Sequence, residues 1–165
     1  MKERPSNHGV LDVMQALWGL AHALEARSKW MHRNLGITGP QRLLLRVIGE
    51  NPGCSPGEAS RILSLNPGTV SRLAAGLERA GLVKRGEDRN DARRQRLLLT
   101  RRGEELNRDH RGTVEGAVRQ VVQGAPGTEV RQARAFLGRL TETLLAPQAR
   151  PARRRRTLAR RTPSP

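Results

Sequence analysis

Two helix starts lie close together in residues 55–80, which read SPGEASRILSLNPGTVSRLAAGLERA. Ser55 and Asn66 each stand directly before a proline, and a capping side chain followed by proline in the first turn is a strong signal for the start of a helix. Glu58 lies three residues after Ser55, which completes the pattern of a capping box. We therefore predict two short helices joined by a tight turn, the second of which ends near Ala80.

Each of these helices is predicted to bury one face. In the first, we expect the apolar side chains to point inward; these are Ala59, Ile62 and Leu63. In the second, the apolar residues recur with the i, i+3, i+4, i+7 spacing of one helix face; they are Val70, Leu73, Ala74 and Leu77. The residues left exposed near the start of the second helix are Gly68, Thr69, Ser71 and Arg72.

The exposed residues of the second helix suit the major groove of DNA. Short hydroxyl side chains reach phosphates or base edges, and an arginine can pair with a guanine through two hydrogen bonds. The free N–H groups at the start of a helix also attract a phosphate. The alternative is an ordinary pair of helices whose polar side faces water.

A β-hairpin is predicted directly after the helix pair. Residues 82–85 and 96–99 are expected to form its strands, and residues 86–92 its charged loop. The hairpin is rich in arginine, at positions Arg85, Arg89, Arg93, Arg94 and Arg96. An arginine at such a tip can enter a narrow minor groove, and Asp91 can orient it through a charge-assisted hydrogen bond. The alternative is a charged turn in solvent.

Two further helices are predicted before this segment. Residues 10–33 carry a long apolar stripe and are expected to form one amphipathic helix, closed by a left-handed residue at Gly36. The next helix begins with a capping-box pattern at residues 38–41. Its residues 43–48 are nearly all apolar, which predicts that it is buried on several sides.

Two more helices are predicted after the hairpin. One runs from Thr100 to Val121 without a break, and the last carries a second heptad-like stripe between residues 130 and 144. The predicted fold class is mainly α with a small β-hairpin wing, a winged helix-turn-helix with N- and C-terminal dimerisation helices. The predicted divisions are an N-terminal dimerisation helix at 1–34, a winged helix-turn-helix DNA-binding domain at 35–105, C-terminal dimerisation helices at 106–147 and a disordered basic tail at 148–165.

The chain is strongly basic, with a net charge of +16. Residues 148–165 alone hold seven arginines and no acid. This balance indicates a polyanionic partner, with nucleic acid the first candidate and an anionic membrane surface the second. Arginine far outnumbers lysine, which a GC-rich genome can produce by itself. The tail is expected to add nonspecific DNA affinity or to bind an acidic partner.

The sequence resembles the MarR-type transcriptional regulators from the start of the second helix to the hairpin. The segments that carry the resemblance are Leu35–Gln41, Ala59–Leu63, Thr69–Leu73, Leu77–Val83, Asp91–Arg93, Leu99-Thr100 and Gly103. It covers roughly residues 10–145. Two features depart from the family's pattern: Pro67-Gly68 replaces polar residues at the start of the recognition helix, and the basic tail is an extension.

The resemblance implies a homodimer whose terminal helices intertwine and whose two winged modules bind a pseudo-palindromic operator in double-stranded DNA. It also implies repression, often of the regulator's own gene cluster, and release by a small phenolic or lipophilic effector or by thiol oxidation. The heptad-like stripes of the first and last helices fit a dimer independently of the resemblance.

Two further sites are candidates for regulation. Trp18, His22 and Arg46, together with Trp30, are expected to line an effector cleft; the alternative places Trp18 in a dimer core with His22 beside it. Cys54 is the only cysteine, and its place just before a helix start predicts a favoured thiolate and a redox role. The alternative is an inert thiol.

Several classes of function are not indicated. The histidines are dispersed, so no metal site is expected, and we find no catalytic constellation, phosphate loop or cofactor motif. No apolar run is long enough to span a membrane, and we expect a cytoplasmic protein. The sequence therefore predicts a sequence-specific DNA-binding transcriptional regulator, with a nonspecific architectural nucleic-acid-binding protein that uses the basic tail as the alternative and an enzyme a distant third.

Overall fold

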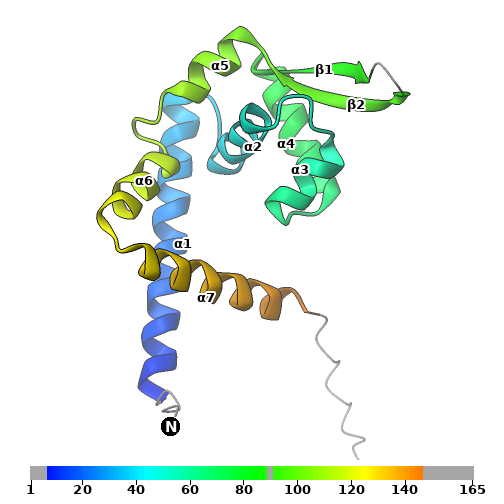
Figure 1. The fold of residues 1–165 in the computed structure, drawn as a ribbon. Helices are drawn as coiled ribbons and strands as arrows, with labels where there is room; N and C mark the ends of the chain where they lie inside the picture. Colours follow the sequence, from blue (N-terminus) through cyan, green and yellow to red (C-terminus); the bar gives the residue numbers. More distant parts are fainter. Residues whose placement is uncertain (1–6, 89–90, 147–165) are drawn as a thin grey trace, which may run out of the picture. The chain divides into compact units, whose positions relative to one another are not determined.

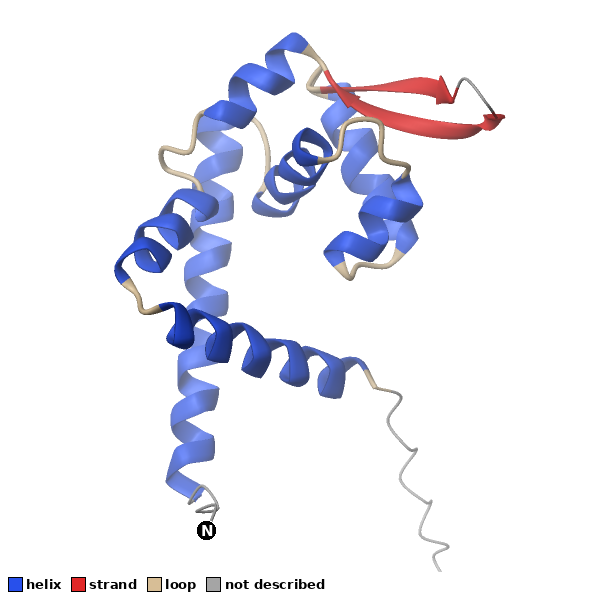
Figure 2. Cartoon of the chain, in the orientation of Figure 1, coloured by secondary structure: helices blue, strands red, loops and turns tan. Residues whose placement is uncertain are grey.

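The computed structural model describes the backbone of residues 7–88 and 91–146, and the side chains of residues 9–86 and 95–146 (Figures 1 and 2). In chain order the elements are α1 (Asn7–Leu35), α2 (Gly39–Glu50), α3 (Pro56–Leu63), α4 (Pro67–Arg79), β1 (Val83–Asp88), β2 (Asp91–Leu99), α5 (Arg101–Arg108), α6 (Val114–Gly124) and α7 (Gly127–Leu145). The chain forms two compact units, residues 1–124 and residues 125–165. Within the described residues, no helix has the length and apolar character that crossing a membrane requires.

The predicted helix starts are confirmed by the caps. Thr38 and Ser55 each form a complete capping box, the second of them with Glu58. Asn66 caps α4 by accepting a hydrogen bond from the Gly68 N–H at 2.8 Å. Gly36, after α1, has a φ of +74°, a left-handed conformation that a glycine adopts without strain.

Helices α2 to α5 and the hairpin share one core; we call residues 37–108 the winged module. Helix α2 lies in the middle of it and contributes Leu44, Leu45 and Ile48, all fully buried. The other buried members of the core are Ile37, Val47, Cys54, Ala59, Val70, Ala74, Leu77, Leu82, Val83 and Leu97. The prediction that α4 buries its regular apolar face is therefore confirmed.

One prediction about a buried side chain is wrong: Ile62, expected to point inward from α3, is 52% exposed. The prediction that α2 is buried on several sides is confirmed by its buried residues Leu44, Leu45, Val47 and Ile48, although Leu43 is 53% exposed. In α2 the place of an apolar side chain is taken by Arg42, which is only 2% exposed. An apolar run shows that a helix can be buried on several sides, but it does not show which residue of the run is exposed to solvent.

The hairpin is longer than predicted. Its antiparallel ladder runs from Val83 opposite Leu99 to Asp88 opposite Asp91, so most of the predicted loop at residues 86–92 is strand. Backbone hydrogen bonds continue the ladder beyond the point where apolar side chains stop, and the sequence pattern marks only the part that contacts the core. The Gly53 N–H also donates to the carbonyl oxygen of Leu97 at 3.0 Å, which ties the loop before α3 to β2.

The single helix predicted from Thr100 to Val121 is wrong, because the chain breaks it between α5 and α6. The Asp109 carboxylate accepts a hydrogen bond from the Arg111 N–H at 3.0 Å, and Gly112 has a φ of +67°. Thr113 then caps α6 by accepting from the Gly116 N–H at 3.0 Å. Local side-chain bonds of this kind compete with helical ones.

Arg42 of α2 forms hydrogen bonds with the residues at this break. Its Nη2 donates to the carbonyl oxygens of Asn107 at 3.2 Å and Asp109 at 2.8 Å, and its Nη1 donates to the carbonyl oxygen of Leu106. Its Nε donates to Glu115, in the first turn of α6, at 3.1 Å. The last carbonyls of a helix lack partners within the helix and carry partial negative charge, so a buried guanidinium stabilises them.

The terminal helices α1, α6 and α7 bury very little. No residue of α6 or α7 is buried, and Met31 is the one buried residue among the described side chains of α1. Large apolar side chains are exposed along all three; they are Val10, Leu11, Val13, Met14, Trp18, Leu20, Leu24, Trp30, Val118, Val121, Val122, Phe136, Leu137, Leu144 and Leu145. The amphipathic stripes predicted for these helices are therefore present and uncovered within one chain.

Candidate nucleic-acid interface

Helix α4 presents a polar surface at its amino end. Gly68, Ser71 and Arg72 are exposed, as predicted from the spacing of the apolar residues, whereas Thr69, also expected to be exposed, is half-buried. Arg72 Nη2 donates to Thr69 Oγ1 at 3.4 Å, so the two side chains lie side by side. The first turn of α4 contains no acid, and its end therefore keeps the positive potential of a helix N-terminus.

Helix α3 differs from α4 at the same point. Glu58 stands in its first turn, where the carboxylate accepts hydrogen bonds from the Ser55 N–H at 2.7 Å and the Ser55 hydroxyl at 3.0 Å. This carboxylate satisfies the helix end and cancels its positive potential. Of the two neighbouring helix starts, the start of α4 is therefore the one that suits an anion.

Arg79 extends the exposed face of α4 and was missed from the sequence. It is exposed and lies seven residues after Arg72, which places both on one side of the helix, two turns apart. The same spacing could have identified it. Gly76 lies between these two arginines on the same side of α4, and a Cβ there would overlap the Gln41 side chain of α2, so α2 approaches the helix at this point.

The wing contributes fewer described side chains than predicted. Arg89 lies outside the described residues, and the side chains of Asp91, Arg93 and Arg94 lie outside them too, so their predicted roles stay predictions. Arg85 is described, and its guanidinium is engaged within the chain. Its Nε donates to Glu78 Oε1 at 2.5 Å, and its Nη1 donates to Gln95 Oε1.

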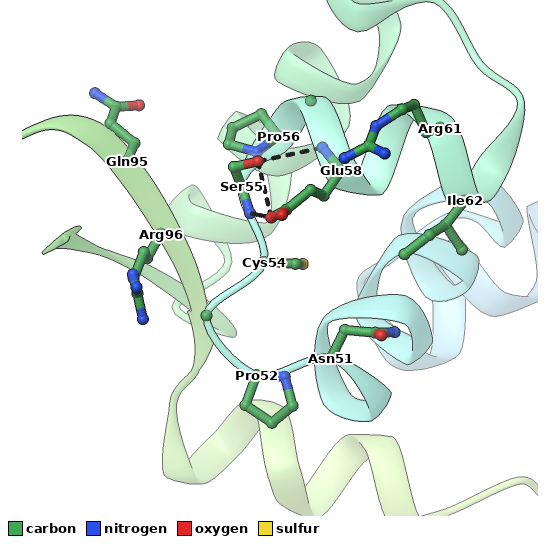
Figure 3. A pocket seen from close by; sticks show the side chains of 12 residues that line it. Asn51, Pro52, Cys54, Ser55, Pro56, Glu58, Arg61, Ile62, Gln95 and Arg96 are labelled. Carbon is green, nitrogen blue, oxygen red and sulfur yellow. Dashed lines mark hydrogen bonds between the residues drawn. The ribbon is translucent and has the colours of Figure 1, made fainter. Parts of the chain in front are cut away.

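An open groove of about 1120 Å³ lies between α3 and β2 (Figure 3). Its lining residues are Asn51, Pro52, Gly53, Cys54, Ser55, Pro56, Gly57, Glu58, Arg61, Ile62, Gln95 and Arg96. In the figure, Gln95 and Arg96 lie on the strand side, and Ser55 and Glu58 lie at the start of α3.

Cys54 lies in the wall of this groove and is 7% exposed. Burial raises the pKa of its thiol, and the neighbouring Glu58 carboxylate raises that pKa further. The prediction that a thiolate is favoured here is therefore wrong. A position before a helix start lowers a thiol pKa only when the helix end is free of negative charge, and Glu58 occupies this one.

The predicted effector residues have separate surroundings. Trp18 and His22 are exposed on α1, the former at 72%. Arg46 is instead tied down by ion pairs with Glu115 at 3.0 Å and Glu50 at 2.7 Å. A second cavity of about 290 Å³ is lined by Ser28, Lys29, His32, Arg33 and Thr38. Neither this cavity nor the groove includes the predicted effector residues.

The chain is similar to known transcriptional regulators in sequence. A family model described as MarR family matches residues 35–94. The HTH-type transcriptional regulator TtmR of Methylorubrum extorquens is 32% identical over 125 residues, which cover 76% of this chain and 62% of TtmR. An HTH-type transcriptional repressor of Mycobacterium tuberculosis is 29% identical over 106 residues, which cover 64% of this chain and 76% of that protein. The chain thus spans about three fifths of the first of these relatives.

Solved structures share the fold. The transcriptional regulator SlyA superposes with a TM-score of 0.65 at 23% identity, over 81% of this chain and 94% of SlyA. The MepR–DNA complex of S. aureus gives a TM-score of 0.64 at 22% identity, over 85% and 99% of the two chains. The PcaV regulator of Streptomyces coelicolor, solved with its natural ligand, gives 0.59 at 19% identity, over 87% and 99%. The predicted mainly helical fold with a two-stranded wing is therefore confirmed.

Proposed function

The chain belongs to the MarR family, whose members are not enzymes, and from that premise we propose that it is a regulator of transcription that binds a two-fold operator in double-stranded DNA as a homodimer. The observation that carries the proposal is the exposed polar face of α4, whose amino end is free of acid and which is followed directly by the wing. The structure of MepR, solved as a complex with DNA, supports the same use of the fold.

In this proposal α4 is the recognition helix. Thr69, Ser71 and Arg72 contact base edges and phosphates in the major groove, and Arg79 contacts the backbone at the far end of the helix. The wing lies over the adjacent minor groove, where Arg93 is the chief contact and Asp91 orients it. The match to the family model covers α4 and the first part of the hairpin, which supports this assignment.

The uncovered stripes of the terminal helices support the homodimer. Side chains such as Met14 and Trp18 are 48% and 72% exposed in a single chain, and an apolar surface of this kind is buried in soluble proteins by a partner. A second copy brings the same stripe, and a two-fold dimer presents two α4 helices to half-sites about one helical turn apart.

We further propose that the chain acts as a repressor of its own or adjacent genes in the cytoplasm. The mycobacterial relative is named a repressor, and PcaV was solved with a natural ligand. The ligand of PcaV supports a further part of the proposal, that a small molecule releases the chain from DNA; a lipophilic or phenolic effector is what the family resemblance implies.

The experiment is selection of bound sequences from a random duplex library, followed by footprinting on the DNA upstream of the chain's own gene across a salt series. We expect a discrete two-fold site whose preference survives added salt. Arg72→Ala is expected to cost about 1–3 kcal/mol on that site, whereas Arg101→Ala removes the same charge from an exposed position of α5 and is the matched control.

The same experiment addresses the architectural alternative, which the charge of +16 favours. Removal of residues 148–165 leaves sequence preference intact in a specific regulator, because that preference comes from α4 and the wing. An architectural binder instead loses most of its affinity and shows uniform, salt-sensitive coverage.

A further inference from the structure

One ion pair joins the end of α4 to the wing. Glu78, in the last turn of α4, accepts from Arg85 Nε at 2.5 Å, and Arg85 on β1 also donates to Gln95 on β2. The side chains of Glu78 and Arg85 are 27% and 34% exposed. These three residues thus connect the recognition helix to both strands of the hairpin.

The contact lies where the hairpin leaves the core. Arg85 stands opposite Leu97 in the ladder, and Val83 and Leu97 are buried at 3% and 0% exposure. Beyond this level Gln95 is exposed. Apolar packing therefore holds the base of the hairpin, and the polar contact of Arg85 begins where that packing ends. Since a two-stranded ribbon is marginally stable by itself, its direction depends on such contacts.

We propose that Glu78 and Arg85 are positioning residues for DNA binding, which hold the wing at the angle to α4 that lets the two reach adjacent grooves of one duplex. The inference rests on the proposed DNA binding. Arg85 was expected to contact DNA directly, but two of its donor groups are used by Glu78 and Gln95. A wing held in advance does not have to be ordered when DNA binds, and this lowers the cost of binding.

Replacement of Glu78 separates positioning from electrostatics by the sign of its effect. Glu78→Gln removes a negative charge next to a surface that faces a polyanion, so electrostatics alone predicts tighter binding to any duplex. Loss of the ion pair with Arg85 frees the wing and predicts weaker binding to the preferred duplex. Glu105→Gln is the matched control, because Glu105 is an exposed acid on α5 paired with Arg101.

The test uses the full-length chain and two probes, the duplex recovered by selection from a random library and a scrambled duplex of the same length. For Glu78→Gln we expect about fivefold weaker binding to the selected duplex, the size of one partly exposed ion pair, and little change on the scrambled one. For Arg85→Ala we expect the same loss with an unchanged salt slope. The double exchange Glu78→Arg with Arg85→Glu is expected to restore most of the affinity.

Two results would overturn the positioning role. One is equal or tighter binding of Glu78→Gln to the selected duplex. The other is a fall of about 0.9 in the salt slope of Arg85→Ala on both duplexes, which marks a phosphate contact. Thermal unfolding of each variant, measured in parallel, shows whether a single variant folds poorly. In that case the double exchange still tests the role of the ion pair, because it keeps both charges. If the unmodified chain shows no preference for any selected duplex, the proposed function itself fails.

Discussion

The winged module and the terminal helices have similar apolar patterns but different surroundings. In the winged module, Leu44, Leu45 and Ile48 are fully buried by neighbours from the same chain. In α6 and α7, apolar residues recur at similar spacing, yet none of them is buried. A single chain therefore buries the apolar side chains of the winged module but does not cover the apolar stripes of the terminal helices.

Helical periodicity specifies that a helix has an apolar face, but not which surface covers that face. A recurrence every three or four residues shows that a helix has an apolar face. It does not show whether the covering surface comes from the same chain or from another copy. Burial of apolar surface contributes about 25 cal/mol per Å², so a covered face adds stability to the chain and an uncovered face adds affinity for a partner.

The largest effect is expected in the core of the module. Leu45→Ala should lower the free energy of unfolding by about 2–5 kcal/mol, because the side chain is fully buried and its removal leaves a cavity. Leu43→Ala, on the same helix but 53% exposed, is the control and should cost less than about 1 kcal/mol. Urea unfolding followed by circular dichroism measures both. Equal losses would contradict the burial of Leu45 in the core of the module and the exposure of Leu43 on its surface.

The second-largest effect is expected where Arg42 joins α2 of the winged module to the break between α5 and α6; we call this contact the joint. Arg42→Met should lower the free energy of unfolding by about 2–3 kcal/mol, since it leaves three carbonyls of the α5–α6 break and Glu115 without their guanidinium. The loss should fall below the range of fully buried pairs because Glu115 is 21% exposed. The double variant with Glu115→Leu should recover part of the loss. Full stability of Arg42→Met would show that the joint needs no cation.

This joint marks the limit of what the sequence could predict. Caps such as Thr38 and Ser55 were predictable because their partners lie three residues away. Arg42 was not, since its partners lie more than sixty residues along the chain. The same limit applies at the interface: the exposed face of α4 follows from local spacing, whereas the engagement of Arg85 by Glu78 and Gln95 depends on how the hairpin folds back.

The dimer surface is expected to give a smaller change, visible in assembly and not in the module. Trp18→Glu should raise the dissociation constant of the dimer about 30-fold, the effect of removing one aromatic anchor. Ala23→Glu places the same charge on the opposite side of α1 and should change it little. Sedimentation equilibrium measures assembly. If both variants assemble like the unmodified chain, the stripe of α1 is not the dimer surface.

The smallest expected effect is that of Gly138→Ala on the free energy of unfolding, and its sign shows whether a second copy packs against this side of α7. A Cβ at Gly138 would meet nothing within 4 Å in a single chain. Alanine is the better helix former, so Gly138→Ala should raise the free energy of unfolding by about 0.5–1 kcal/mol. In the module the corresponding change Gly103→Ala should be destabilising, because its Cβ would overlap the carbonyl oxygen of Leu82. Thermal unfolding at several protein concentrations measures both.

A decrease in the free energy of unfolding for Gly138→Ala that grows with protein concentration would mean that a second copy packs closely on this side of α7. The absence of any decrease would confine the dimer contact to the other faces of the terminal helices.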